Sequence, residues 1–248
     1  GLLVVVFIFG VPLYWMLSAA LKTLAEIYTF PPIWWPRSLH WANFATAWQA
    51  APFGNFFLNS LITTTAIVLL KLGNAVLSAY ALVFLRVPGR TVIFIVLLAA
   101  LMVPEQALIL PNYLTVSALG WNNTYAGLIL PHAGVAFGTF LLRQHFLTLP
   151  KDILEAAQIE GAGHGRILWH IALPLSAPVL ATVALLAAVN SWNEFLWPLI
   201  ITNSREMRTL PIGMAFLFQQ EGTTQWAIVI AATVFVVAPV LLFFFSPQ

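Results

Sequence analysis

Residues 149–174 read LPKDILEAAQIEGAGHGRILWHIALP, a polar stretch between long apolar segments. Asp152 precedes an apolar-periodic run and Glu155 follows three residues later, so the pair predicts an N-terminal capping box and a helix that starts at Ile153. Two glycines, of which Gly161 is the first, predict that the helix ends in a left-handed turn. A helix of about two to three turns, about 12–15 Å long, is too short to cross a bilayer. We therefore expect this helix to lie outside the lipid.

The composition indicates an integral membrane protein. Of the 248 residues, 61% are hydrophobic and 7% are charged, whereas a soluble domain carries about 25% charged residues. The formal net charge of +2 is small and does not suggest a nucleic-acid partner. The absence of cysteine excludes disulfides and thiolate chemistry. Because Gly1 already lies in an apolar run and Gln248 directly follows one, we expect both ends to be trimmed.

The apolar segments predict an all-α polytopic membrane protein. A bilayer requires about 20 apolar residues per helix, and backbone groups in lipid must be hydrogen-bonded within the element. We expect six transmembrane helices in a single domain over residues 1–248, with the 149–174 loop between the fourth and the fifth. The expected spans lie at about 2–21, 56–80, 91–111, 124–147, 174–201 and 224–246.

The spacing within the 149–174 loop also carries a family resemblance. It resembles the EAA loop of permease subunits in bacterial binding-protein-dependent ABC importers. Three further segments extend the resemblance to most of the chain, and they are similar to MalG-like subunits of carbohydrate importers and to the permease of glycerol-3-phosphate importers. These segments are TFLLRQHFLTLP at 139–150, WNEFLWPLI at 192–200 and EGTTQW at 221–226.

The resemblance implies that the loop is a cytoplasmic coupling helix held in a cleft of an ATPase subunit. It further implies a multi-pass protein of the bacterial inner membrane, whose partners are a second permease, two ATPase subunits that carry ATP and Mg, and an external solute-binding protein. Small residues let another backbone approach, and a first-turn glutamate offers a carboxylate to a partner's cation. An ordinary solvated loop helix is the alternative. The coupling residues would be Glu155, Ala156, Ala157, Glu160, Gly161, Ile171, Leu173 and Pro174.

The distribution of cations agrees with this orientation, since short cytoplasmic loops carry an excess of Lys and Arg. With the 149–174 loop inside, six cations fall on the inner side, if Lys71 is placed at the inner end of its helix, and four fall on the outer side. The inner cations are Lys71, Arg86, Arg90, Arg143, Lys151 and Arg166, and the outer ones are Lys22, Arg37, Arg205 and Arg208.

The fifth expected span carries the candidate solute contacts. Asn190, Asn193, Glu194 and Trp197 stand at i, i+3, i+4 and i+7, which predicts one helix face. A carboxylate near the middle of a membrane costs about 2.5–3.5 kcal/mol on insertion scales and is a functional-site hypothesis by default. Amides and carboxylates bind hydroxyls, and an indole stacks on sugar rings, so the face suits a polyhydroxylated solute. Alternatively, Glu194 lies at the outer mouth or pairs with Lys71.

Two further regions contribute candidates. The second span has one polar stripe through Asn55, Asn59 and Thr63 and another through Lys71, Asn74 and Ser78; Asn59 and Thr63 are pathway candidates, but hydrogen bonding between helices explains such stripes equally well. We expect His132 to be a buried, hydrogen-bonded histidine. The 202–224 segment is a polar outer loop, and the resemblance implies that it faces the receptor through Arg205, Arg208, Gln219, Gln220 and Glu221.

Several motifs are missing from the sequence. There is no GxxxxGK[ST] phosphate loop, HExxH or GxSxG, so we expect no ATP site of that kind, no metal site and no catalytic residue in this chain. The leading hypothesis is an importer permease for a neutral carbohydrate, because a phosphate would require Arg or Lys along a path whose fifth-span face offers Glu194. Glycerol-3-phosphate or its diesters are the alternative solutes. An ion-driven transporter using Glu194 and a membrane scaffold are the other hypotheses.

Overall fold

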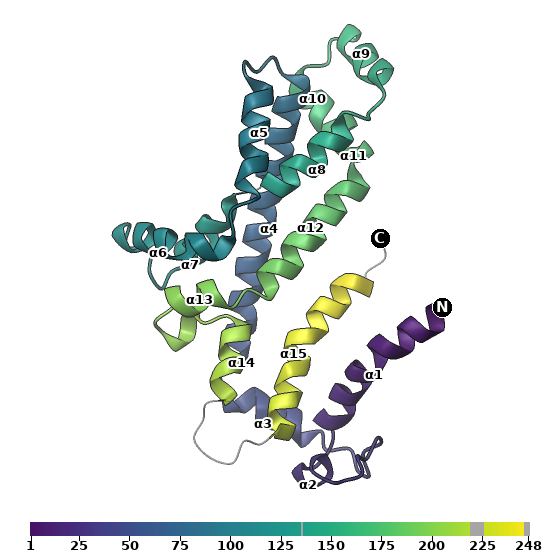
Figure 1. Ribbon diagram of the computed structural model, residues 1–248, viewed down its shortest axis with the longest axis vertical. Helices are drawn as coiled ribbons and strands as arrows, with labels where there is room; N and C mark the ends of the chain where they lie inside the picture. Colours follow the sequence, from purple (N-terminus) through teal and green to yellow (C-terminus); the bar gives the residue numbers. More distant parts are fainter. Residues whose placement is uncertain (135, 219–225, 246–248) are drawn as a thin grey trace. The chain divides into compact units, whose positions relative to one another are not determined.

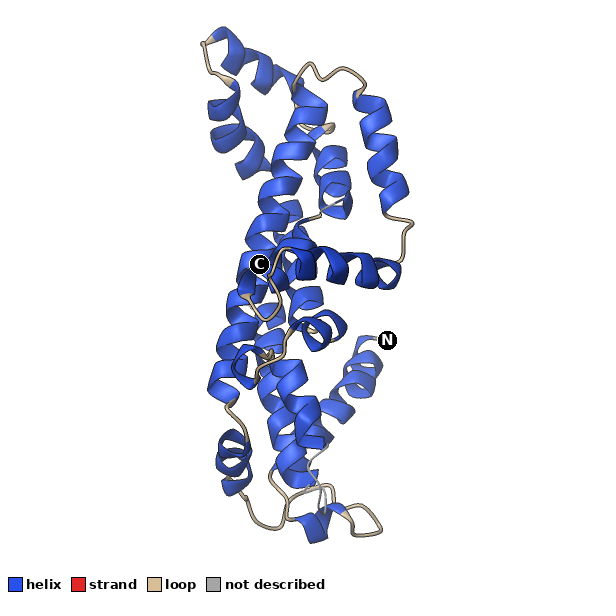
Figure 2. Ribbon diagram, turned by 90° about the vertical axis from the view of Figure 1, so that its left-hand side faces the viewer, coloured by secondary structure: helices blue, strands red, loops and turns tan. Residues whose placement is uncertain are grey.

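The computed structural model describes residues 1–134, 136–218 and 226–245 (Figure 1). These residues form helices joined by loops, with no strand among them, and this confirms the all-α fold (Figure 2). The chain divides into two units, the first formed by Gly1–Ser60 together with Thr202–Pro247 and the second by Leu61–Ile201.

Aromatic packing forms the core of the first unit. Phe235 of α15 lies 5.9 Å from Phe44 and 5.4 Å from Trp48, both on α3, and 5.9 Å from Phe53 at the start of α4, measured between ring centroids. Rings at these separations attract each other beyond the effect of their buried area. The helices of this unit are α1 Leu2–Ala20, α2 Leu24–Ile27, α3 Ala42–Ala50, the first turns of α4 Phe53–Phe84, η4 Arg205–Met207, α14 Leu210–Phe218 and α15 Trp226–Phe245.

A buried lysine fixes the chain that follows α1. The Lys22 side chain is fully buried, donates a hydrogen bond to the Ile33 carbonyl and lies 4.2 Å from the centroid of the Trp15 ring. Loss of solvation on burial lowers the pKa of the Lys22 ammonium, and the nearby Glu26 carboxylate opposes that shift. The Asn43 amide donates to the Ala20 and Lys22 carbonyls at 2.9 Å each. These bonds hold residues 23–43 against the end of α1.

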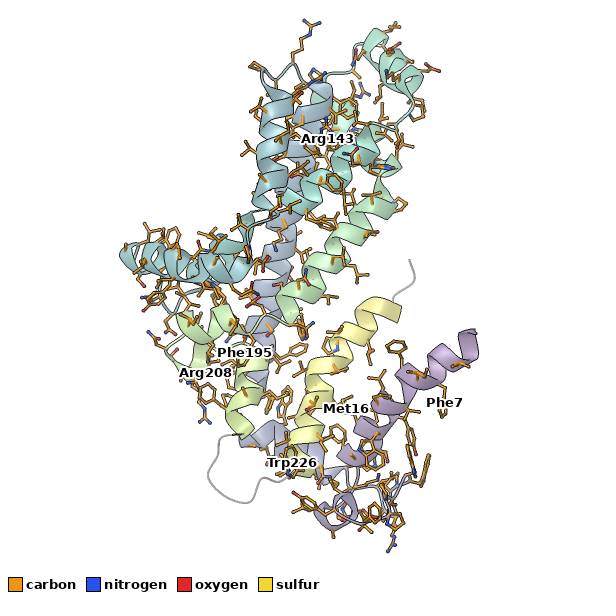
Figure 3. All side chains as sticks on the ribbon, in the orientation of Figure 1. Phe7, Met16, Arg143, Phe195, Arg208 and Trp226 are labelled. Carbon is orange, nitrogen blue, oxygen red and sulfur yellow. The ribbon has the colours of Figure 1, made fainter. Side chains whose placement is uncertain are left out.

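In the second unit, α5 packs against α8. The Arg143 guanidinium on α8 lies 3.9 Å from the centroid of the Phe94 ring on α5, and Phe94 stacks on Phe140 at 6.2 Å (Figure 3). Besides the rest of α4, the helices are α5 Arg90–Ala100, η1 Glu105–Leu108, α6 Ile109–Ala118, α7 Tyr125–Ile129, η2 Leu130–Ala133, α8 Ala136–Phe146, α9 Lys151–Ile159, α10 His164–Ile167, η3 Leu168–Ala172, α11 Leu173–Leu175, α12 Ala177–Trp192 and α13 Leu196–Ile201.

Several of the expected spans are broken. Among the described residues, α4 is the one helix that is long and apolar enough to cross a membrane alone, and the number rises to four if each of three bent helix pairs counts as one span. Within the expected span at about 91–111, the chain turns by 93° between α5 and residues 105–118. Pro104 stands at this break and disfavours helical backbone at the residue before it.

We predict that Gly213→Ala destabilises the first unit. A Cβ at Gly213 of α14 would lie inside contact distance of the Phe56 ring, which is itself buried. Forcing a methyl group into a packed core costs about 1–3 kcal/mol, so the midpoint of thermal unfolding in detergent, followed by tryptophan fluorescence, should fall.

Gly73→Ala is the matched control for this substitution. Gly73 lies within α4, and a Cβ added there would meet no atom within 4 Å outside its own stretch of helix. Alanine also favours a helix over glycine by about 1 kcal/mol, so the midpoint of this variant should stay unchanged or rise. Equal midpoints for both variants would contradict the packing described here.

Candidate functional site

The helix expected in the 149–174 loop is present as α9, at one end of the second unit (Figure 1). The predicted cap at its start is wrong. Helix α9 begins at Lys151, Pro150 is the residue before it, and no side chain caps it, so Asp152 lies inside the first turn. Proline fits this boundary because its ring disfavours helical backbone at the preceding residue. Asp152 still faces the positive end of the helix dipole.

The end of α9 is as predicted. Gly161 adopts φ +82°, the left-handed conformation, and its N–H bonds the Gln158 carbonyl at 3.0 Å. The next N–H, of Ala162, bonds the Ala157 carbonyl at 2.9 Å. This pair of bonds is the Schellman motif, which satisfies the last carbonyls of a helix. Glycine at 161 therefore stops the helix sharply and turns the chain toward α10.

A single side chain of α9 is buried. Leu154 is 8% exposed and belongs to a core that also contains Tyr80 of α4, Phe146 of α8 and Ile167 of α10. None of the predicted coupling residues is fully buried. Glu155, Ala156, Glu160 and Gly161 are exposed, and so is Pro174, while Ala157, Ile171 and Leu173 are half-buried beside the core. Among the apolar side chains of α9, Ile153 is 46% exposed and Ile159 is 86% exposed.

A tyrosine that the sequence did not single out fastens the loop to α4. The Tyr80 hydroxyl donates to the His164 carbonyl at 3.0 Å and lies 3.2 Å from the same residue's Nδ1. The predicted span stopped at residue 80, whereas α4 continues to Phe84. The apolar run that follows Tyr80 in the sequence was the signal for a longer helix. The contact between the loop and the bundle is made by Tyr80 itself, at the end of the predicted span.

The predicted face of the fifth span does not form. Helix α12 ends at Trp192, and α13 starts only at Leu196. The Glu194 carboxylate accepts a hydrogen bond from the Trp197 N–H at 3.2 Å, as a cap at the start of α13 does. The Trp197 ring is 4% exposed and its Nε1 donates to the Gly127 carbonyl at 3.0 Å, so it packs inside the protein. Asn190 is exposed on α12.

The remaining residues of this region bond locally. The Asn193 amide donates to the Val189 carbonyl at 2.8 Å, which closes the end of α12. Periodicity placed four residues on one face only because it assumed an unbroken helix through residues 190–197. A role of Asn190, Asn193 and Glu194 in the solute pathway stays a prediction.

Asn59 and Thr63 of α4 are both buried, and Asn59 makes structural bonds. Its amide donates to the Glu206 carbonyl at 2.6 Å and to the Arg208 carbonyl at 2.9 Å. The expected loop over 202–224 is partly helical, since its apolar residues 210–218 form α14. Arg205 is exposed, and the Arg208 guanidinium lies 3.7 Å from the centroid of the Phe216 ring (Figure 3). Gln219, Gln220 and Glu221 lie outside the described residues.

Lys71 lies inside α4. It is the nineteenth of the 32 residues of this helix, so its placement at a helix end was wrong. The expectation rested on the charge of Lys71 alone, and the predicted span of 56–80 already placed this residue away from both of its ends.

Comparison with known proteins gives the class of the molecule. Residues 71–246 match the family described as the inner membrane component of binding-protein-dependent transport systems. This match covers more than half of the chain, which therefore belongs to that family. The protein is a permease subunit of an ABC transporter, located in the inner membrane, and it serves transport rather than catalysis.

Individual relatives are similar over nearly the whole chain. The sn-glycerol-3-phosphate transport system permease protein UgpE of Yersinia enterocolitica is 36% identical over 246 residues, which are 96% of this chain and 86% of that protein. The probable ABC transporter permease protein YurM of Bacillus subtilis is 32% identical over 240 residues, 96% of this chain and 79% of that one.

A solved structure supports the fold. The chain resembles a chain in the crystal structure of a bacterial ABC transporter involved in the import of the acidic polysaccharide alginate, with a TM-score of 0.86 and 23% identity. The match covers 97% of this chain and 91% of that one.

We predict that Tyr80→Phe loosens the 163–168 segment. The variant keeps the ring in the core and removes the hydroxyl that bonds the His164 carbonyl, a bond worth about 1 kcal/mol. Hydrogen–deuterium exchange of the purified protein should be faster at these amides than in the wild type. His164→Ala is the control, because it keeps the backbone carbonyl and should exchange as the wild type does. Unchanged exchange in Tyr80→Phe would contradict the role of this bond.

Proposed function

We propose that this chain is one of two permease subunits of an ATP-driven importer and forms half of the translocation pathway, with α9 as the cytoplasmic coupling helix. The observation that carries the proposal is that one side chain of α9 is buried in the bundle while other apolar side chains of the same helix are exposed. Leu154 anchors the helix to the bundle, while Ile153 and Ile159 are exposed although they are apolar. We assign these exposed side chains, together with the small residues Ala156 and Gly161, to the surface that the ATPase subunit covers.

The proposal includes six membrane spans in one transmembrane domain, with the bent helix pairs counted as single spans and α1 and α15 as the first and last. Lys71 no longer counts as an inner cation, so five cations on the inner side face four on the outer side; the inner ones are Arg86, Arg90, Arg143, Lys151 and Arg166. The excess still has the sign that a cytoplasmic α9 requires.

In this mechanism the energy comes from partner subunits. ATP and Mg bind to two ATPase subunits, this chain holds no cofactor, and an external solute-binding protein delivers the solute. Closure of the ATPase pair moves α9, and the buried contacts of Leu154 and Tyr80 pass the movement to α8 and α4. ATP on one side and loaded receptor on the other then bias an equilibrium between inward-open and outward-open states.

The solute that we propose is polyhydroxylated, a carbohydrate as the MalG-like resemblance suggests. Glycerol-3-phosphate is the second candidate, supported by the name of the UgpE relative. An ion-driven mechanism has less support, because the Glu194 carboxylate that it would use caps α13.

The test is the charge reversal Glu155→Lys in the transporter assembled with its partners in proteoliposomes. Glu155 is exposed and makes no contact with the core, so the permease should fold and assemble normally. Because the reversed charge would repel the cation of the ATPase cleft, solute uptake per ATP hydrolysed should fall at least tenfold. The same reversal at Glu206, which is exposed on η4, should leave this ratio unchanged. Coupled uptake at the wild-type ratio in Glu155→Lys would contradict the proposal.

A further inference from the structure

The position of Lys71 is the feature that the proposed function leaves unexplained. A helix rises about 1.5 Å per residue, so Lys71 lies about 20 Å from the end of α4 at Phe84 and about 27 Å from its start at Phe53. A lysine side chain is much shorter than either distance, so the Lys71 ammonium lies beside the middle of α4 and not beyond either of its ends. An ammonium in the interior of a membrane-spanning helix is costly and marks a functional site by default.

The ammonium of Lys71 forms no ion pair in the part of the chain that the structure describes. Within residues 1–134, 136–218 and 226–245, no carboxylate lies within ion-pair distance of it and no hydrogen bond to it is formed. The side chain is half-buried rather than enclosed by this chain. A cation without an ion-pair partner in the interior of a helix of a transport subunit is a candidate for binding an anion.

A second polar group accompanies Lys71. The His132 imidazole, on η2, lies within electrostatic range of the Lys71 ammonium, and the carboxylate within its range belongs to Glu105 of η1. The ring is held in place, because the Trp197 indole packs edge-on against it at 6.3 Å between centroids. Trp197 is in turn fixed by its bond to the Gly127 carbonyl.

One turn further along α4, another side chain positions the same segment. The Asn74 amide donates to the carbonyl of Ala133, the residue after His132, at 3.0 Å. Lys71 and Asn74 share a helix face, at offsets of three residues. The Lys71 side of α4 and the 130–133 turn are therefore tied together, and they present an ammonium and an imidazole to the same region.

We propose that Lys71, with His132 beside it, binds the acidic group of an anionic solute on its way through the permease. This inference rests on the proposed function and names the class of its solute. Phosphate and carboxylate oxygens both accept hydrogen bonds from an ammonium, so a phosphomonoester or a sugar acid fits the site. Asn74 and Trp197 are positioning residues. A neutral solute is no longer favoured, because Glu194 caps α13 while a lysine stands within the span.

The experiment uses the transporter assembled with its ATPase subunits, second permease and receptor in proteoliposomes. Uptake is measured for two anionic probes, sn-glycerol-3-phosphate and trigalacturonate, and for the neutral probe maltose. The wild type should take up an anionic probe. Lys71→Met should reduce that uptake at least tenfold, while receptor-stimulated ATP hydrolysis stays within twofold of the wild type. Lys71→Arg keeps the charge and should retain at least a third of the uptake.

Two controls separate this role from a structural one. Arg90→Met removes a cation at the first residue of α5, outside the span, and should leave uptake unchanged. If Lys71 only balances the Glu105 carboxylate, the double variant Lys71→Met with Glu105→Gln should recover uptake; we expect no recovery.

Four outcomes would each overturn the proposal. In the wild type, these are uptake of maltose without uptake of either anion, and uptake of none of the probes. In the variants, they are anion uptake by Lys71→Met within twofold of the wild type, and recovery of uptake in the double variant. A complex whose ATP hydrolysis does not respond to the receptor would instead contradict the proposed function itself.

Discussion

The buried seam between the end of α4 and the 149–172 segment is the constraint on which the rest of the second unit depends. Leu154, Ile167 and Leu168 of that segment share one core with Ala75, Ala79 and Tyr80 of α4. Burying an apolar side chain of this size contributes about 1.5–3 kcal/mol, so several such contacts hold a short polar helix that has little stability alone. A displacement of α9 must therefore move α4 or break the seam.

The surface of α9 that lies outside the seam gives the segment its second property. A nine-residue helix with one buried residue has most of its surface available to a partner. Its sharp end at Gly161 leaves α10 free to return to the bundle at once, where the Tyr80 hydroxyl meets the first residue of α10. The buried Leu154 and the exposed Ile159 are thus less than two helical turns apart on α9. This short separation suits a rigid connection between two proteins.

Local sequence rules predicted the features that depend on local chemistry. The helix at α9, the left-handed glycine that ends it and the all-helical fold all follow from composition, spacing and glycine's freedom at positive φ. The rules failed at boundaries inside apolar runs. Pro104 and Glu194 stand at breaks in such runs, and the Glu194 carboxylate accepts a bond from the Trp197 N–H at the start of α13. Lys71 was misplaced because a charge was expected at a helix end, whereas α4 continues through it to Phe84.

Two charged residues lie in other positions than the sequence suggested. Lys71 lies in the interior of α4 rather than at its end. The Glu194 carboxylate accepts a bond from the Trp197 N–H and so forms a cap at the start of α13.

The most direct measurement is site-specific crosslinking of α9, which is simplified because these 248 residues contain no cysteine. In the assembled transporter, Ile159→Cys, at a side chain that is 86% exposed in this chain, should crosslink to an ATPase subunit and resist a membrane-impermeant thiol reagent added outside whole cells. Labelling of this position from outside, or no crosslink to any partner in the assembled complex, would contradict the account.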